Sequence, residues 1–272
     1  MDVADLSGQV VIRKSSCACR NWWTQALCIR TIIVTNSLFS SSEARSLLAN
    51  RQRRTPCVLL LDRSYSMEGE KIRRLNAGFD VFRQDILRNP VAAQSVDLAV
   101  ISFGPVKLER DFAPLSETES LQLQASGATP MRKALELAML KVTERKRSYQ
   151  QHGISYYRPW IFLLTDGEPT DDNGQGCDGY KALIPPLELA AQEQKFTLFT
   201  VGVNVSPYGR AVLDDLSRPF KGRCLDLDNL KFEEMFLWLS ASLSRVSQSA
   251  PGDRVQLVDP RVGDDVYDGW VL

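Results

Sequence analysis

Continuous apolar runs of strand length alternate with helical patterns along most of this chain, and this alternation restricts the possible folds more than any other feature. The runs "CVLLL" (57–61) and "WIFLL" (160–164) contain no polar residue at the alternate positions that a half-exposed strand would need. Between such runs, apolar residues recur at spacings of three and four, as in 70–88. Strands connected by helices pair in parallel, so the pattern predicts a doubly wound α/β fold with helices on both faces of the sheet.

The order of the elements predicts a mostly parallel six-stranded sheet with one antiparallel edge strand. Two strand-like runs, 95–104 and 106–115, meet at Gly104-Pro105, which is typical of a hairpin. We expect a helix to end at Asn89-Pro90 and another to have Pro130 as its first residue. The remaining predicted strands are 196–204 and the run "RCLDLD", and further helices are predicted in "GRAVLDDLS" and "KFEEMFLWLSASLSRV".

The 272 residues divide into three predicted parts. Residues 1–53 are interpreted as a poorly ordered N-terminal extension, because only Glu43 is acidic between Val10 and Asn50 while arginine and serine are frequent. A targeting segment or a start assigned upstream of the true domain are the alternatives for this extension. We expect one α/β domain at 54–247 and a C-terminal tail along the surface at 248–272.

The overall composition excludes several classes of function. The 33 basic and 33 acidic residues balance, so no general attraction to nucleic acid or to a membrane surface is expected. No apolar run approaches the roughly 20 residues that span a bilayer. We therefore predict a soluble, intracellular protein. The single histidine, His152, lies in a polar segment and the six cysteines lack paired CxxC spacing, which argues against a zinc centre or a serine–histidine triad.

Oxygen-bearing side chains occur where predicted strands end or where the next helix begins. Asp62, Ser64 and Ser66 follow the first strand, Thr129 precedes a helix, and Asp166 follows "IFLLT". In an open parallel sheet, ligands bind beyond the carboxyl ends of the strands, near the point where the strand order reverses. Hydroxyl and carboxylate oxygens without imidazole or thiolate are the donors that hard divalent cations prefer. The sequence therefore predicts a Mg²⁺ site, which Mn²⁺ could also occupy.

The charge of the predicted site indicates its use. Asp62 and Asp166 only balance a divalent ion, so the ion remains electrophilic and can accept an oxygen from outside the chain. An aspartate or glutamate of a partner protein would supply that carboxylate. Each residue also has an ordinary alternative: Ser64 or Ser66 could cap the following helix, Thr129 could cap the next, and Asp166-Gly167 could form a turn.

The quoted segments also carry a family resemblance. "LLLDRSYSM", "SGATP" and "FLLTDGEPTDD" resemble the metal-ion-dependent adhesion site of von Willebrand factor type A (vWA) domains. "LTDGEPTDD" and "FEEMFLWLSASLS" are similar to the bacterial TerY-like group of tellurium-resistance and stress-associated proteins. The resemblance implies a cytoplasmic, magnesium-dependent protein-binding domain without catalysis, which acts alongside stress-response proteins that include kinases and phosphatases. The metal-site residues that it implies are Asp62, Ser64, Ser66, Thr129 and Asp166.

Two positions depart from the usual vWA pattern. Tyr65 and Ala128 stand where related domains commonly carry glycine. Glycine adopts backbone angles that larger residues resist, so these positions predict an altered loop shape. An aromatic side chain beside the ion could also influence the choice of partner.

Two rival interpretations remain for the same residues. A vWA fold could serve as a scaffold without metal. A magnesium-dependent phosphohydrolase of the haloacid-dehalogenase kind would use Asp62 as its nucleophile, but it needs a second aspartate two residues later, where this chain has Ser64. The phosphate-binding motif GxxxxGK[ST] does not occur and no GxGxxG directly follows a predicted strand, so a nucleotide enzyme is not indicated.

Overall fold

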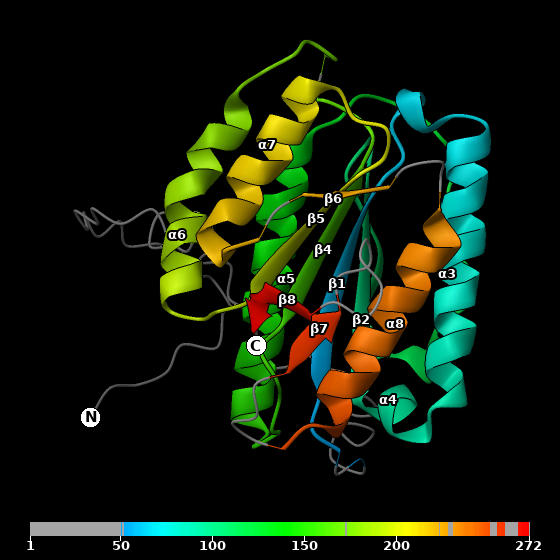
Figure 1. Ribbon diagram of the computed structural model, residues 1–272, viewed down its shortest axis with the longest axis vertical. Helices are drawn as coiled ribbons and strands as arrows, with labels where there is room; N and C mark the ends of the chain where they lie inside the picture. Colours follow the sequence, from blue (N-terminus) through cyan, green and yellow to red (C-terminus); the bar gives the residue numbers. More distant parts are fainter. Residues whose placement is uncertain are drawn as a thin grey trace, which may run out of the picture. The chain divides into compact units, whose positions relative to one another are not determined.

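A six-stranded sheet organises the part of the chain that the structure, a computed structural model, describes (Figure 1). The described residues are 50, 52–171, 173–222, 224–227, 231–250, 255–258 and 266–271. Most of the predicted extension at 1–53 therefore lies outside them. The strands are ordered β3-β2-β1-β4-β5-β6, and only β3, at one edge, pairs antiparallel. Their bounds are β1 Thr55–Asp62, β2 Val96–Phe103, β3 Lys107–Pro114, β4 Trp160–Thr165, β5 Thr197–Gly202 and β6 Leu225–Asp226.

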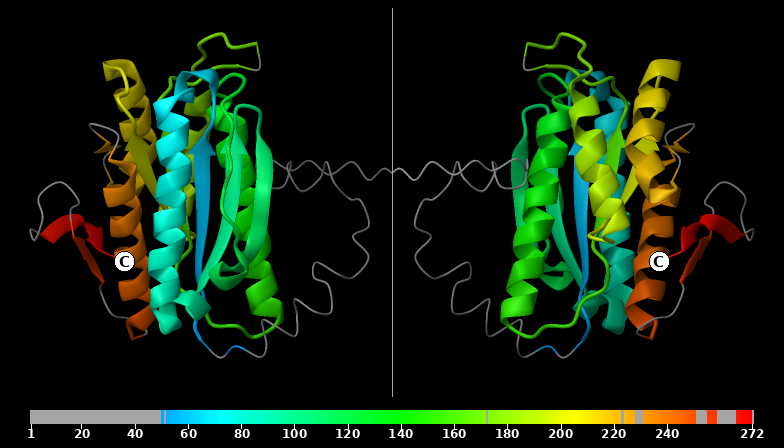
Figure 2. Two further views of the ribbon diagram at one scale, coloured as in Figure 1. Left: turned by 90° about the vertical axis from the view of Figure 1, so that its right-hand side faces the viewer. Right: turned by 90° about the vertical axis from the view of Figure 1, so that its left-hand side faces the viewer.

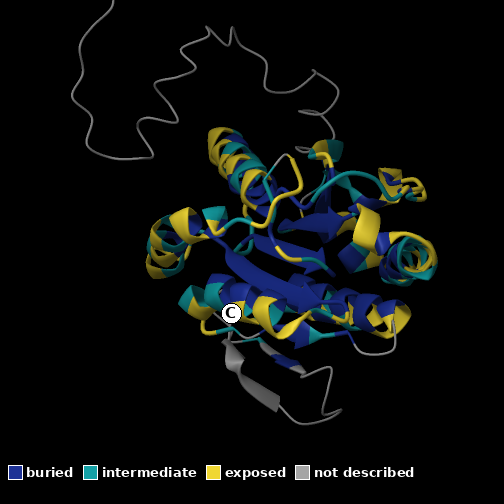
Figure 3. Ribbon diagram, turned by 90° about the horizontal axis from the view of Figure 1, so that it is seen from above, coloured by how far each residue is buried: buried dark blue, intermediate teal, exposed yellow. Residues whose placement is uncertain are grey.

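Helices cover both faces of this sheet, which confirms the predicted doubly wound α/β class. One layer contains α3, α4 and α8, and the opposite layer contains α5, α6 and α7 (Figure 1). Figure 2 shows α3 beside α8 in one view, and Figure 3 shows buried strands between helices with exposed outer sides. The bounds are α3 Glu70–Arg88, α4 Pro90–Ser95, α5 Met131–Gln151, α6 Ile184–Gln192, α7 Pro207–Ser217 and α8 Phe232–Gln248. Short 3-10 turns cover Tyr65–Met67, Leu115–Glu117, Gly179–Leu183 and Arg218–Phe220.

The structure differs from the sequence predictions at two prolines and in the tail. Asn89-Pro90 ends α3 but also starts α4, because the Asn89 side chain accepts hydrogen bonds from the backbone N–H groups of Val91 and Ala92 at 3.1 Å. Helix α5 begins one residue after Pro130. In the predicted tail, β7 (Gln256–Val258) and β8 (Val266–Val271) pair antiparallel, which the sequence did not lead us to expect.

The central strands are buried along their whole length, as continuous apolar runs require. Every residue of β1, β2, β4 and β5 is buried. The layer of α3 and α8 packs its aromatic side chains together, and the Phe82 and Phe236 ring centroids lie 5.9 Å apart. None of the helices within the described ranges is both long and apolar enough to cross a membrane.

Gly78 sets the separation of α3 and α8. A Cβ atom at this position would lie 2.6 Å from Cδ2 of Phe236 and 3.2 Å from Cβ of Phe232. Both phenylalanines are fully buried, so neither ring can move aside freely. The two helices approach this closely because residue 78 has no side chain.

We predict that Gly78→Ala lowers the free energy of unfolding by about 1–3 kcal/mol, although alanine is the better helix former at exposed positions. The measurement is denaturant unfolding followed by circular dichroism. Gly209→Ala in α7 is the matched control, because its added Cβ would have ordinary contacts of 3.4 Å or more. If both variants gain stability, helix propensity outweighs packing at the α3–α8 contact.

Candidate metal site

The five predicted site residues lie at the carboxyl edge of the sheet, where the strand order reverses. Asp62 is the last residue of β1 and Asp166 directly follows β4. These strands are neighbours, paired through Leu61 and Leu164, while β2 lies on the other side of β1. This is the position at which open α/β sheets bind ligands.

A chain of hydrogen bonds joins four of these residues. Asp62 Oδ1 accepts from the Ser64 backbone N–H at 2.7 Å. The hydroxyls of Ser64 and Ser66 are 2.9 Å apart, and Ser66 Oγ donates to Asp166 Oδ1 at 2.6 Å. The alternate spacing of the two serines thus brings their hydroxyls into contact with each other, and Ser66 connects them to Asp166.

Thr129 lies beside the four hydrogen-bonded residues, which together with it form the oxygen cluster, and Gly167 lies next to its hydroxyl. A Cβ atom on Gly167 would lie 3.2 Å from Thr129 Oγ1 and 3.6 Å from Ser66 Oγ, so both hydroxyls lie beside the same backbone position. The Thr129 backbone is fixed by Thr170, whose hydroxyl accepts the Thr129 N–H at 2.8 Å. All five predicted residues are therefore brought together.

The ordinary explanation by helix capping does not account for these hydroxyls. The residue before α3 is Gly69, which has no side chain with which to cap the helix. The residue before α5 is Pro130, so Thr129 lies one position too early to be its cap residue. Ser66 instead donates to Asp166.

Burial dominates the electrostatics of Asp62. The residue is fully buried, and this desolvation raises its pKa to about 7. Hydrogen bonds from Thr165 and Ser64 oppose the rise, and the nearby Asp166 adds to it. A positive charge placed beside Asp62 would therefore favour its ionised form.

The sequence reasoning missed two residues that contact the cluster, Thr165 and Lys71. Thr165 Oγ1 donates to Asp62 Oδ2 at 2.5 Å and accepts the Gly167 N–H at 3.1 Å. Its signal in the sequence is its position directly before Asp166. Lys71 forms an ion pair with Asp166 and donates to the Ser66 carbonyl oxygen at 3.2 Å, and nothing in its local sequence distinguishes it from a surface lysine.

The loop geometry explains why Tyr65 and Ala128 are tolerated in place of glycine. Among the described residues other than glycine, positive φ angles occur at Gln194, Asn204 and Lys221, so neither Tyr65 nor Ala128 needs the left-handed region. Gly127 does need it, with φ of 75°. The backbone angles at these two positions therefore do not require glycine, and the predicted change in loop shape does not follow from them.

Gly127 also brings two loops together. A Cβ atom on it would overlap the carbonyl oxygen of Gly104, and its own carbonyl accepts the Tyr65 N–H at 3.0 Å. The loop after β1 is thereby held against the segment before α5. The Tyr65 side chain points outward and is 68% exposed.

The donor chemistry of the cluster fits a hard cation. Its side chains offer hydroxyl and carboxylate oxygens, which are the ligands that Mg²⁺ and Mn²⁺ prefer. The Ser66 hydroxyl uses its proton for Asp166 and therefore accepts from the Ser64 hydroxyl, which leaves one lone pair of Ser66 Oγ for a cation. Among the described residues, no three His, Cys, Asp or Glu side chains form a group that could bind a metal, so hydroxyls would have to contribute.

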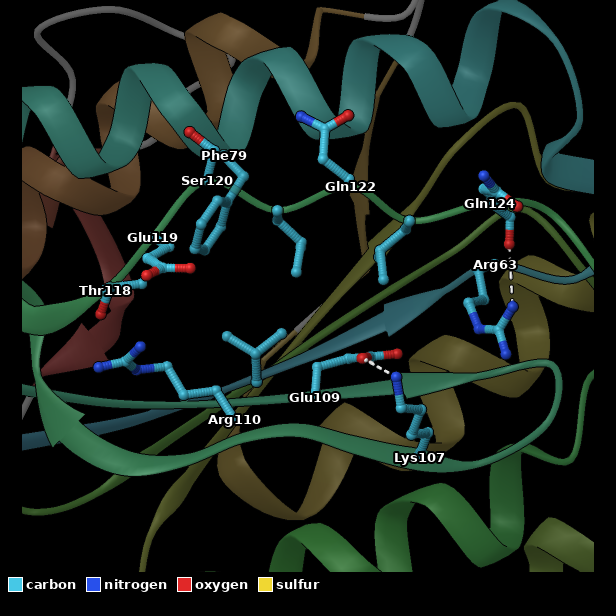
Figure 4. Close-up of a pocket in the computed structure, with 13 residues that line it drawn as sticks. Arg63, Phe79, Lys107, Glu109, Arg110, Thr118, Glu119, Ser120, Gln122 and Gln124 are labelled. Carbon is cyan, nitrogen blue, oxygen red and sulfur yellow. Dashed lines mark hydrogen bonds and ion pairs between the residues drawn. The ribbon is translucent and has the colours of Figure 1, made fainter.

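A polar pocket of about 440 Å³ lies between β3, α3 and the segment 118–124 (Figure 4). Lys107 pairs with Glu109 at 2.6 Å, and Arg63 donates to the Gln124 carbonyl oxygen at 2.9 Å. These charged groups are thus already paired within the protein. The oxygen cluster remains the stronger candidate site.

We predict that Asp62→Asn flattens the pH dependence of stability in the presence of EDTA. The folded chain holds the Asp62 proton more tightly than the unfolded chain, because burial raises this pKa to about 7. The resulting stabilisation is complete below about pH 4 and is lost as the pH rises through about 7. Thermal unfolding followed by circular dichroism should show a steeper fall in Tm for the wild type between about pH 5 and about pH 8. If the Tm of both proteins fell equally with pH, the pH dependence could not be assigned to the raised pKa of Asp62.

Comparison with known proteins identifies the fold. No protein-family model matches this sequence, and no curated protein has a significantly similar sequence. The pilus adhesin SpaC from Lactobacillus rhamnosus GG, in its open conformation, aligns with 72% of this chain at 14% identity and a TM-score of 0.56. The aligned part makes up 31% of the SpaC chain.

A second similar structure is the vWF domain of the type V pili tip protein Mfa5 from Porphyromonas gingivalis. It aligns with 74% of this chain and 99% of its own length, at 10% identity and a TM-score of 0.53. At such identities the likeness concerns the fold alone, and the closer resemblance to the TerY-like group stays a prediction. The chain has the six-stranded, mostly parallel α/β fold of vWA-like domains.

Proposed function

We propose that this chain is a protein-recognition domain that binds its partner through a divalent cation, Mg²⁺ or Mn²⁺. The observation that supports the proposal most is the joined set of oxygen side chains at the point where the strand order reverses. Asp62, Ser64, Ser66, Thr129 and Asp166 would hold the ion. When bound, the ion would supply an electrophilic position for a carboxylate of the partner.

The surroundings of the cluster support recognition of a protein. Two of the large apolar side chains that are exposed among the described residues, Tyr65 and Tyr208, follow the carboxyl ends of β1 and β5. Tyr208 is 43% exposed and donates to Asp178 at 2.7 Å. Exposed tyrosines are frequent anchors of protein interfaces. The partner would offer an aspartate or glutamate to the ion and an apolar surface to these rings.

The finer assignments rest on the sequence resemblance. They are a cytoplasmic location, a role in tellurite or other stress responses, and association with stress-response kinases or phosphatases. The balanced charge of the chain favours a protein partner over nucleic acid or a membrane surface.

Two alternatives differ from the proposal in specific ways. In a metal-free scaffold, Lys71 would balance Asp166 permanently, and this ion pair is the observation in its favour. In a phosphohydrolase, Asp62 would be the nucleophile. The hydroxyl of Ser64, two residues later, is hydrogen-bonded to Ser66 and has no suitable pKa for acid–base work, so we propose a non-enzymatic role.

We predict that Thr129→Val weakens Mg²⁺ and Mn²⁺ binding at least about tenfold, because it removes one ligand hydroxyl at nearly constant volume. Isothermal calorimetry on the full chain measures the affinity. Thr143→Val in α5 is a control, since that hydroxyl donates only to the Met139 carbonyl oxygen within the helix. Equal cation affinity in the wild type and Thr129→Val would remove this residue from the site.

We predict that Tyr65→Ala weakens partner capture without changing cation affinity. The reason is that the ring is exposed and is not among the side chains whose hydroxyl or carboxylate oxygens form the hydrogen-bonded cluster. Proteins retained from a lysate on the immobilised chain, with Mg²⁺ and with EDTA, are compared by mass spectrometry. A partner that depends on Mg²⁺ and on Thr129 but not on Tyr65 would contradict the role of the ring.

A further inference from the structure

The cationic side chain of Lys71 contacts the oxygen cluster directly. Its ammonium group pairs with Asp166 Oδ2 and donates to the Ser66 carbonyl oxygen at 3.2 Å. The Asp166 side chain is fully buried, whereas the Lys71 side chain is 27% exposed. The pair therefore joins a buried carboxylate to a lysine that can still reach solvent.

The position of Lys71 in its helix does not explain these contacts. Lys71 is the second residue of α3, where the positive end of the helix dipole disfavours a cation. The acidic residue of the first turn, Glu70, accepts instead from Arg73 and from Arg74. Lys71 is thus directed away from its helical neighbours and toward Asp166.

Lys71 uses the same acceptor that a bound cation would need. Ser66 donates to Asp166 Oδ1, and Lys71 takes the second oxygen, Oδ2. An ammonium group and a divalent ion that both approach this buried carboxylate would repel each other. A flexible four-carbon stem allows the lysine to leave toward solvent.

We propose that Lys71 is an internal competitor of the divalent cation for Asp166, so that cation binding requires the ammonium group to leave this carboxylate. This inference rests on the proposed function, because it concerns the same site. The lysine reduces cation affinity and compensates the buried charge of Asp166 when the ion is removed. It thereby sets the cation concentration at which the domain becomes competent to bind its partner.

Calorimetry with Mg²⁺ and Mn²⁺ on the full chain tests the competition. Lys71→Met keeps an unbranched chain but removes the charge, and it should bind the cations about tenfold more tightly than the wild type. Lys71→Arg keeps a cation and should resemble the wild type. Lys107→Met is the matched control, because it breaks a comparable ion pair, with Glu109, away from the cluster.

Thermal unfolding separates competition from a purely structural role. Under competition, Lys71→Met lowers Tm in EDTA, and saturating Mg²⁺ restores it, so the cation-induced shift in Tm exceeds that of the wild type. A structural role would lower Tm equally in EDTA and in Mg²⁺, without a gain in affinity, and would overturn the inference.

The outcomes for the inference and for the proposed function are distinct. Cation binding by the wild type with equal or weaker binding by Lys71→Met overturns the inference and leaves the function intact. If Lys71→Met binds a cation and the wild type does not, the inference is supported, and the wild-type chain is a scaffold that works without metal. If neither the wild type nor any variant binds a cation, both the inference and the proposed function are overturned.

Discussion

Two carboxylates buried side by side are the constraint on which the candidate site depends. Asp62 and Asp166 follow neighbouring parallel strands, so the sheet itself brings them together at the carboxyl edge. Removal from water disfavours both negative charges, and their proximity adds repulsion. The hydroxyl groups of Ser66 and Thr165 donate to them, and Lys71 supplies a positive charge. The loops around the site are arranged to deliver these donors.

The fold was largely predictable because burial on both faces leaves a clear mark on the sequence. A strand such as β1 must be apolar at every position, and the helices between such strands leave little choice of topology. One difference arose where a single local signal has two meanings. Asn89-Pro90 both ends α3 and caps α4, since asparagine accepts N–H bonds and proline suits a first helical turn.

The positions of the candidate-site residues could be predicted where those residues follow a strand or precede a helix. Asp62, Ser64 and Ser66 follow β1 directly, so the expected sheet places them at its carboxyl edge. Lys71 could not be found this way, because its contact with Asp166 joins residues 95 positions apart. The spacing of residues within a loop motif predicts how those residues lie relative to one another. A tertiary ion pair such as Lys71–Asp166 depends instead on where the following helix begins and in which direction its side chains point.

The core packing that stabilises the fold and the residues of the candidate site lie in different parts of the domain. The aromatic core between α3, α8 and the sheet is buried independently of the hydroxyl cluster, and Lys71 compensates Asp166 from within the chain. Under the proposed competition, the same internal compensation would oppose cation binding, because the ion would have to replace a favourable contact. On that proposal, stability without the ion and affinity for the ion would be set against each other at one carboxylate, Asp166.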